Sequence, residues 1–239
     1  IDKMNKPEKV FINNQISISG ARILYFLIIL SGGIIAIYLA FYVRQFPLFF
    51  IYPLAVFLLW SYSKYSKKRV LTGNIIVSFF CAFVAGIVLF AERAAFWQLK
   101  ELNPEEYSRL YILFGGYLLF AFFSTMFREI IKDLEDKAGD EQLNCRTLPI
   151  VFGEKTAKIT GAIFGIVLFI LVSFFGIWLW EKTEIPGLIF TVLGILFPLF
   201  YSIFKLLKAQ TKTNYADLSK YTKFIMLSGL ILLIIINLT

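Results

Sequence analysis

The sequence predicts an all-α fold, a polytopic bundle of transmembrane helices. Of its 239 residues, 59% are hydrophobic, and the mean hydropathy is +0.75, which is more apolar than soluble domains are. Apolar runs near the length of about 20 residues that crosses a bilayer recur along the whole chain. We predict seven spans, at residues 21–43, 46–61, 75–91, 108–127, 157–180, 187–204 and 222–238.

The basic residues predict how these spans are oriented. Segments 1–22, 61–74, 128–158 and 205–223 hold 19 of the 24 Lys and Arg residues, and the alternating connections hold the other five. Because cytoplasmic loops carry the excess of Lys and Arg, we expect the first set to be cytoplasmic. The formal net charge of +8 then reflects topology and contact with anionic lipid headgroups, and it implies no nucleic-acid partner.

The residue types that are present limit the possible chemistry. The chain has no His, which excludes a His general base and a zinc site built on His ligands. Cys81 falls within a predicted span and Cys145 within a predicted cytoplasmic loop, so we expect no disulfide framework. Acid–base or metal chemistry must therefore use carboxylates, Lys, Tyr or water.

A run of charged residues, REIIKDLEDKAGD at 128–140, follows the fourth span. On a helix, Glu129, Asp133, Asp136 and Asp140 fall within about 60° of one another, so four carboxylates would face one way. Like charges three or four residues apart repel each other. A hard divalent cation, which takes oxygen ligands, would compensate them.

A second interpretation of this run stays open. Arg128, Lys132 and Lys137 are interleaved with the acids, and a solvated helix laced with salt bridges would show the same pattern. The position of the run beside an apolar span, where charge is costly, favours the metal site.

The ends of the helix that would carry the run are also predicted. Asn103 is a candidate N-cap, followed by Pro104 at the first helical position and by Glu106 at the third. We expect the helix to start near 104, cross the membrane and stop or bend at Gly139.

The basic loop YSKYSKKRVLTGN at 62–74 also has two interpretations. It is typical of a positive-inside anchor with an interfacial tyrosine. Alternatively, Tyr62, Lys67 and Lys68 could bind a phosphate at the cytoplasmic mouth of the bundle.

Three segments resemble one known family, the UbiA-type intramembrane prenyltransferases. REIIKDLEDKAGDEQLNCRTLPIVFGEK resembles the family's second aspartate-rich motif with its trailing Thr-Leu-Pro-x-x-x-Gly, and YSKYSKKRVLTGN resembles its basic loop. IDKMNKPEKV resembles the end of its first aspartate-rich motif. The residues of these motifs are most similar to those of the digeranylgeranylglyceryl phosphate synthase-like branch. Two stretches depart from that branch, residues 9–14 and the pair Asn144-Cys145.

The resemblance implies a fold of nine transmembrane helices. We therefore expect residues 1–239 to be a single domain that is incomplete at its N-terminus and begins after the second helix. Asp2 would be the last aspartate of the first motif. We also expect a multi-pass protein of the cell membrane, specifically of a prokaryotic inner membrane. Its active site would face the cytoplasm.

The resemblance further implies a transferase that moves a polyprenyl group, geranylgeranyl, from its diphosphate to a membrane-embedded acceptor such as geranylgeranylglyceryl phosphate. Mg²⁺ would assist ionisation of the diphosphate. The implied residues are of two kinds: metal ligands at Asp2, Asp133, Asp136, Asp140 and Glu129, with Asp133, Asp136 and Asp140 also catalytic, and diphosphate-binding residues at Tyr62, Lys67, Lys68 and Arg146.

Three alternatives remain at this point. One is a quinone-type enzyme of the same family that prenylates an aromatic acceptor. A cation-coupled membrane transporter is the second, since intramembrane carboxylates are typical of ion pathways. The third is a non-catalytic membrane scaffold, which leaves the row of carboxylates unexplained.

Overall fold

The computed structural model describes residues 15–66 and 69–238, and it places them almost entirely in helices, with no strand among them. Seven helical segments of this part are long and apolar enough to cross a membrane, which confirms the predicted number of spans. The first three comprise α2 (Ile18–Tyr42), then η2 (Phe46–Phe50) with α3 (Ile51–Ser61) and η3 (Tyr62–Ser66), then α4 (Thr72–Ala91). The protein is a multi-pass membrane protein.

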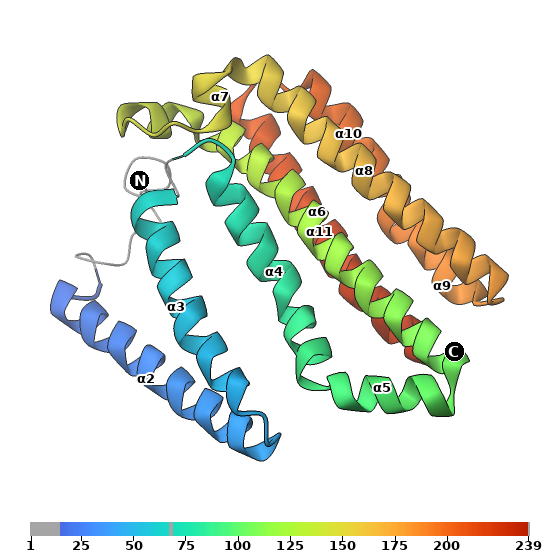
Figure 1. The fold of residues 1–239 in the computed structure, drawn as a ribbon. Helices are drawn as coiled ribbons and strands as arrows, with labels where there is room; N and C mark the ends of the chain where they lie inside the picture. Colours follow the sequence, from blue (N-terminus) through green and yellow to red (C-terminus); the bar gives the residue numbers. More distant parts are fainter. Residues whose placement is uncertain (1–14, 67–68, 239) are drawn as a thin grey trace.

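The remaining spans form the compact half of the bundle. They are α6 (Pro104–Gln142), α8 (Gly153–Glu181), the composite of α9 (Ile185–Phe190), η4 (Thr191–Leu196) and α10 (Phe197–Lys208), and α11 (Lys212–Leu238). Two short helices join them, α5 (Arg93–Leu102) and α7 (Leu148–Val151). In Figure 1, α6 runs through the middle of the bundle, and it packs against α4, α8 and α11.

The start of α6 follows the predicted capping pattern. The Asn103 side chain accepts a hydrogen bond from the Glu106 N–H at 3.1 Å, and Pro104 occupies the first helical position. At 1.5 Å per residue, the 39 residues of α6 span about 58 Å. A hydrocarbon core of about 30 Å cannot contain that length, so α6 projects beyond it and carries the acidic run in its projecting part.

The predicted stop at Gly139 is wrong. Gly139 is buried inside α6, and the helix continues to Gln142. The chain leaves the helix at Asn144, whose φ is +51°, while the N–H groups of Leu143 and Cys145 donate to the Asp140 carbonyl at 3.2 and 2.9 Å. Asn tolerates this left-handed conformation nearly as well as Gly, and it therefore takes over the terminating role.

Helix α5 lies in the connection between the third and fourth predicted spans, where the apolar pattern predicts no span. Phe96 on α5 packs edge-on against Tyr107 and Phe114 of α6, with ring centroids 6.3 and 5.8 Å apart. Trp97 is exposed, and the Lys100 ammonium lies over its ring. A helix with one apolar face and a border of Trp and Lys is typical of the membrane interface. In Figure 1, α5 lies crosswise at the end of the bundle opposite the acidic run.

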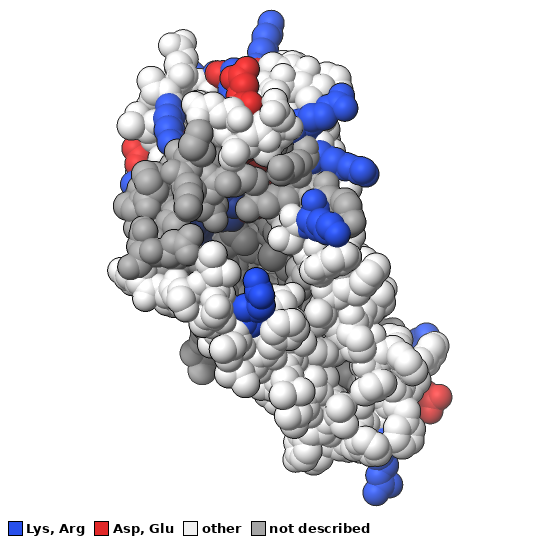
Figure 2. Space-filling model, turned by 90° about the vertical axis from the view of Figure 1, so that its left-hand side faces the viewer, with Lys and Arg blue, Asp and Glu red and all other residues white. Residues whose placement is uncertain are grey.

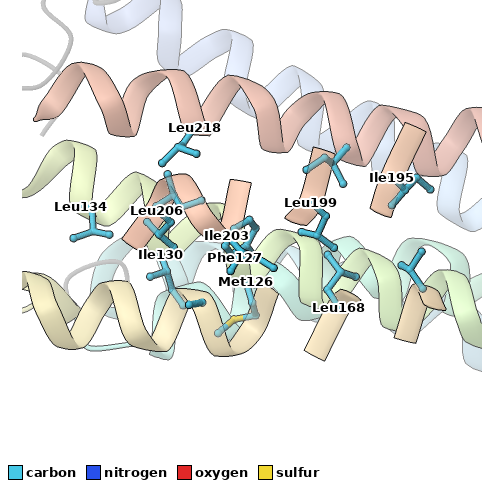
Figure 3. Packing of buried hydrophobic residues seen from close by; sticks show 14 of the residues in the cluster. Met126, Phe127, Ile130, Leu134, Leu168, Ile195, Leu199, Ile203, Leu206 and Leu218 are labelled. Atoms are coloured by element: carbon cyan, nitrogen blue, oxygen red, sulfur yellow. The ribbon is translucent and has the colours of Figure 1, made fainter. Parts of the chain in front are cut away.

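The core lies between α6, α8, α10 and α11, and Figure 3 shows part of it. Met126, Phe127 and Ile130 of α6 are essentially inaccessible to solvent, and they pack in one cluster with Leu168 of α8 and Leu206 of α10. In lipid, such packing rests on close approach of helices at small residues. The packing fixes α6, and with it the base of the acidic run.

The charged surface has two unequal ends. On the face shown in Figure 2, most Lys and Arg side chains lie in the upper part, and a broad surface almost without charge separates them from a few at the lower tip. This distribution fits a bundle that crosses a bilayer with its more basic end on one side.

The close packing of α8 against α6 and α10 can be tested at Gly165 of α8. A Cβ atom there would lie 2.7 Å from Ile203 Cγ1 and 3.1 Å from the Phe127 ring, whereas a Cβ at Gly115 of α6 would have no neighbour within 4 Å. We expect Gly165→Ala to destabilise the folded protein by about 1–3 kcal/mol, because α8 must move away from α10 and α6. Gly115→Ala is the matched control. Thermal unfolding in detergent measures both, and equal melting temperatures would contradict the prediction.

Candidate active site at the acidic end of α6

Three elements meet at the projecting end of α6. The acidic run occupies its last four turns, the first turn of α4 lies beside it, and η3 leads into that part of α4. In Figure 1 these segments gather at the upper end of the bundle. The apolar spans thus bring charged and polar side chains together at one level, although 59 residues separate some of them in sequence.

Asp133 is held by a side chain from another helix. Asn74, which is 8% exposed in the first turn of α4, donates its Nδ2–H to Asp133 Oδ2 at 2.8 Å. A hydrogen bond from a neutral amide orients a carboxylate without neutralising its charge. The hydrogen bond from Asn74 therefore fixes the position of the Asp133 carboxylate.

Other acids and one tyrosine surround this pair. Glu129 and Asp140 lie close enough to Asp133 for their charges to interact, and the Tyr62 side chain lies within electrostatic reach of Glu129 and Asp133. Tyr62 is partly buried at the start of η3. Residues from both motifs of the sequence therefore face the same small region.

The basic residues of the run point to partners outside the row of aspartates. Glu129 pairs with Arg128 at 2.6 Å and with Lys132 at 3.5 Å, and Lys137 pairs with Glu154 of α8 at 2.9 Å. Glu129 is thus compensated within the run, which makes it a weaker candidate metal ligand than the aspartates. The interleaved salt bridges of the second interpretation are present, and within the described residues Arg128, Lys132 and Lys137 form ion pairs with glutamates.

Asp136 and Asp140 lie one and two turns beyond Asp133 on α6. Asp140 is 6% exposed, and Asp136 is partly buried. Within the described ranges, no three acidic or cysteine side chains come together as a complete metal site. Mg²⁺ does not need such a cage, since it keeps several waters and binds one or two carboxylates together with substrate phosphates.

The donor atoms present fit a hard cation. Asp133, Asp136, Asp140 and Asn74 offer only oxygen acceptors towards an ion. The nearest soft ligand, Cys145, is buried, and its thiol faces the Leu143 carbonyl at 4.0 Å. A site of this composition suits Mg²⁺ and not a thiolate-preferring metal.

Three predicted residues, Asp2, Lys67 and Lys68, lie outside the described residues. Arg146 is exposed in the connection between α6 and α7. Their assignment to metal and diphosphate binding stays a prediction.

An apolar cavity of about 270 Å³ lies elsewhere, between α6, α8, η4 and α11. Its lining includes Gly116, Phe120 and Trp178. Phe120 precedes Asp133 by thirteen residues, about 20 Å along the helix, so this cavity does not reach the acids.

Comparison with known proteins places this arrangement in a family. The sequence profile described as the UbiA prenyltransferase family matches residues 1–227. The chain belongs to this family. A protein of Methanococcus aeolicus named digeranylgeranylglyceryl phosphate synthase is 31% identical over 233 residues, which cover 95% of this chain and 72% of that protein. Its namesake in Sulfurisphaera tokodaii is 34% identical over 178 residues, 73% of this chain and 56% of that protein.

A solved structure shares the fold. It was reported in connection with digeranylgeranylglyceryl phosphate synthase in membranes, and it superposes with a TM-score of 0.58 at 20% identity, covering 96% of this chain and 75% of that one. The family profile confirms the predicted UbiA membership, and the shared fold agrees with the predicted helical bundle.

Sequence reasoning missed two residues that shape the site, Asn74 and Glu154. Asn74 gave a usable signal, because an amide in the first turn of an apolar span must find a buried partner. Glu154 gave none, since its pairing with Lys137 depends on how α7 turns the chain between α6 and α8.

The Asn74–Asp133 hydrogen bond can be tested by a pair of substitutions in α4. We expect Asn74→Ala to cost about 1.5–3 kcal/mol of stability, because it removes a hydrogen bond to a charged group. Ser78→Ala is the control, since Ser78 is fully buried on the same helix and its hydroxyl has no hydrogen-bond partner. Unfolding in detergent measures both variants, and a double-mutant cycle with Asp133→Asn isolates the pair. A coupling energy near zero would refute the interaction.

Proposed function

We propose that the protein transfers a polyprenyl group from its diphosphate to a lipid-like acceptor in the membrane. The family membership supports the reaction class. The names of the relatives support geranylgeranyl as the group and geranylgeranylglyceryl phosphate as the acceptor. Of the two acceptor classes considered, lipid phosphate and aromatic ring, these names favour the lipid phosphate.

The observation that carries the proposal is the cluster of carboxylates at one end of an apolar bundle. Among the described residues, the only charged side chains that are buried are Glu129, Glu135 and Asp140, and all three belong to the acidic run of α6. A cation transporter needs polar groups at the depth of the bilayer centre. A reaction at the end of the bundle needs charged groups at that end, and the buried carboxylates lie there.

Each residue has a proposed task. Asp133, Asp136 and Asp140 would hold Mg²⁺, with Asn74 orienting the Asp133 carboxylate. When bound, the metal would neutralise charge on the diphosphate and make it a better leaving group. The Tyr62 hydroxyl would donate to a diphosphate oxygen, with Lys67, Lys68 and Arg146 supplying positive charge.

The apolar helices around this mouth would exclude water. The allylic carbon that loses diphosphate becomes electron-deficient, and water would consume it before the acceptor reacts. We place the site on the cytoplasmic side, since the connections at that end carry most of the Lys and Arg. Asp2 would contribute to a second metal ion.

Replacing one proposed ligand tests the metal site. We expect Asp136→Ala to lower the transfer rate roughly a thousandfold or more, because a lost ligand removes several kcal/mol of transition-state stabilisation. Asp217→Ala is the matched control, since Asp217 is an exposed carboxylate on α11 that pairs with Lys220 at 3.1 Å. Turnover of geranylgeranyl diphosphate in lipid with Mg²⁺ measures both. Activity that persists in EDTA would sink the assignment.

The hydroxyl of Tyr62 tests diphosphate binding separately. Tyr62→Phe keeps the ring and removes the donor, so we expect about tenfold weaker binding of a non-hydrolysable prenyl diphosphate analogue. Tyr111→Phe, at an exposed position on the opposite half of α6, should leave binding unchanged. If both variants bind as the wild type does, Tyr62 serves only as an interfacial anchor.

A further inference from the structure

Lys137 occupies a sensitive position on α6. It follows Asp133 by four residues, the spacing at which a carboxylate and an ammonium on one helix form a pair, with the acid on the favoured N-terminal side. It also lies between Asp136 and Asp140 in sequence. Left to local geometry, Lys137 would place a positive charge on the aspartates that the proposed metal ion needs.

The structure directs Lys137 elsewhere. Its Nζ donates to Glu154 Oε1 at 2.9 Å, across the gap between α6 and α8. The two side chains are 33% and 40% exposed, so the pair contributes little to stability. The pair nevertheless determines where the positive charge of Lys137 lies.

Glu154 is well placed to hold that lysine. Gly153 has a φ of +83°, a conformation that glycine adopts without strain, and it turns the chain from α7 into the first turn of α8. Glu154 therefore sits at a helix N-terminus, where a carboxylate is favoured. The other nearby ammonium, Lys158, donates to the Ala209 carbonyl, and the Tyr215 side chain also lies within hydrogen-bonding reach of Glu154. Among these neighbours, Lys137 forms the salt bridge with Glu154.

We propose that Glu154 is a positioning residue that keeps the Lys137 ammonium off the Asp133 carboxylate, so that the row of aspartates stays negative enough to bind a divalent cation. This inference rests on the proposed function of the row. It assigns Glu154 no contact with substrate or metal, because Glu154 acts only through Lys137.

The inference predicts opposite effects for the two members of one salt bridge. In Glu154→Gln the lysine is released, and it should turn to Asp133 and weaken cation binding about fivefold. In Lys137→Gln no charge is left to interfere, and cation binding should equal or exceed that of the wild type. The double variant should recover wild-type affinity to within about twofold. A bridge that merely joined α6 to α8 would make all three variants weaker alike.

The experiment is a titration of the purified protein in detergent with Mn²⁺ as the probe, read by the electron paramagnetic resonance signal of the free ion. The Mg²⁺ concentration that gives half-maximal transfer is the second readout. Weaker binding in Glu154→Gln that is reversed by adding Lys137→Gln supports the proposal. Unchanged binding in Glu154→Gln, or weakened binding in Lys137→Gln alone, overturns it.

Two controls separate this inference from the proposed function. Asp136→Ala should lose Mn²⁺ binding, and if the wild type itself binds no Mn²⁺, the metal site fails and the role of Glu154 falls with it. If the wild type binds and Asp136→Ala does not, but Glu154→Gln matches the wild type, only the role of Glu154 fails. Thermal unfolding of each variant confirms that the folded protein is being compared.

Discussion

The continuity of α6 is the constraint on which the rest of the structure depends. Inside a bilayer, every backbone N–H and C=O must be satisfied by the segment itself, and a helix does this without interruption. Because α6 stays helical from Pro104 to Gln142, the same continuous helix that packs against α4, α8 and α11 also carries the aspartates. Packing in the apolar part therefore fixes the geometry of the polar part.

A second constraint concerns the charged side chains at the C-terminal end of α6 and the partners that each of them has. Basic and acidic residues are interleaved along the run, so each basic side chain has several acidic side chains within reach. Two glutamates accept the basic residues, Glu129 within the run and Glu154 from α8. Asp133 receives a neutral amide instead. Neutral donors fix a carboxylate in place, whereas cations would cancel it.

Much of this could be predicted from the sequence, because membrane helices and their caps are local features. Apolar runs predicted the seven spans, and the Asn103-Pro104-Glu105-Glu106 pattern predicted where α6 begins. Local reasoning went wrong at Gly139, where burial in the helix outweighed the tendency of glycine to end one. It also missed α5, which is too short and too polar to be recognised as a span.

The unpredicted parts of the site have a common cause. Asn74 meets Asp133 across 59 residues, and Glu154 meets Lys137 across 17. Such pairs depend on how the helices pack, and no spacing rule within one helix contains that information. The periodicity of the run identified which face carries the acids, but only the neighbouring helices decide which acids are compensated.

Helix α5 provides a reference point from which the position of the aspartates along α6 can be measured. Its composition is typical of the membrane interface, and α6 starts two residues after it ends. The aspartates at the other end of α6 therefore lie at a fixed number of residues from this interfacial helix. Asp133 stands 29 residues beyond Pro104, about 44 Å along the axis. The tilt of α6 then converts this length into depth, and adding or removing one helical turn between the two would shift the aspartates by about 5.4 Å along the axis. A bilayer of another thickness would therefore present the same residues to a different layer of lipid.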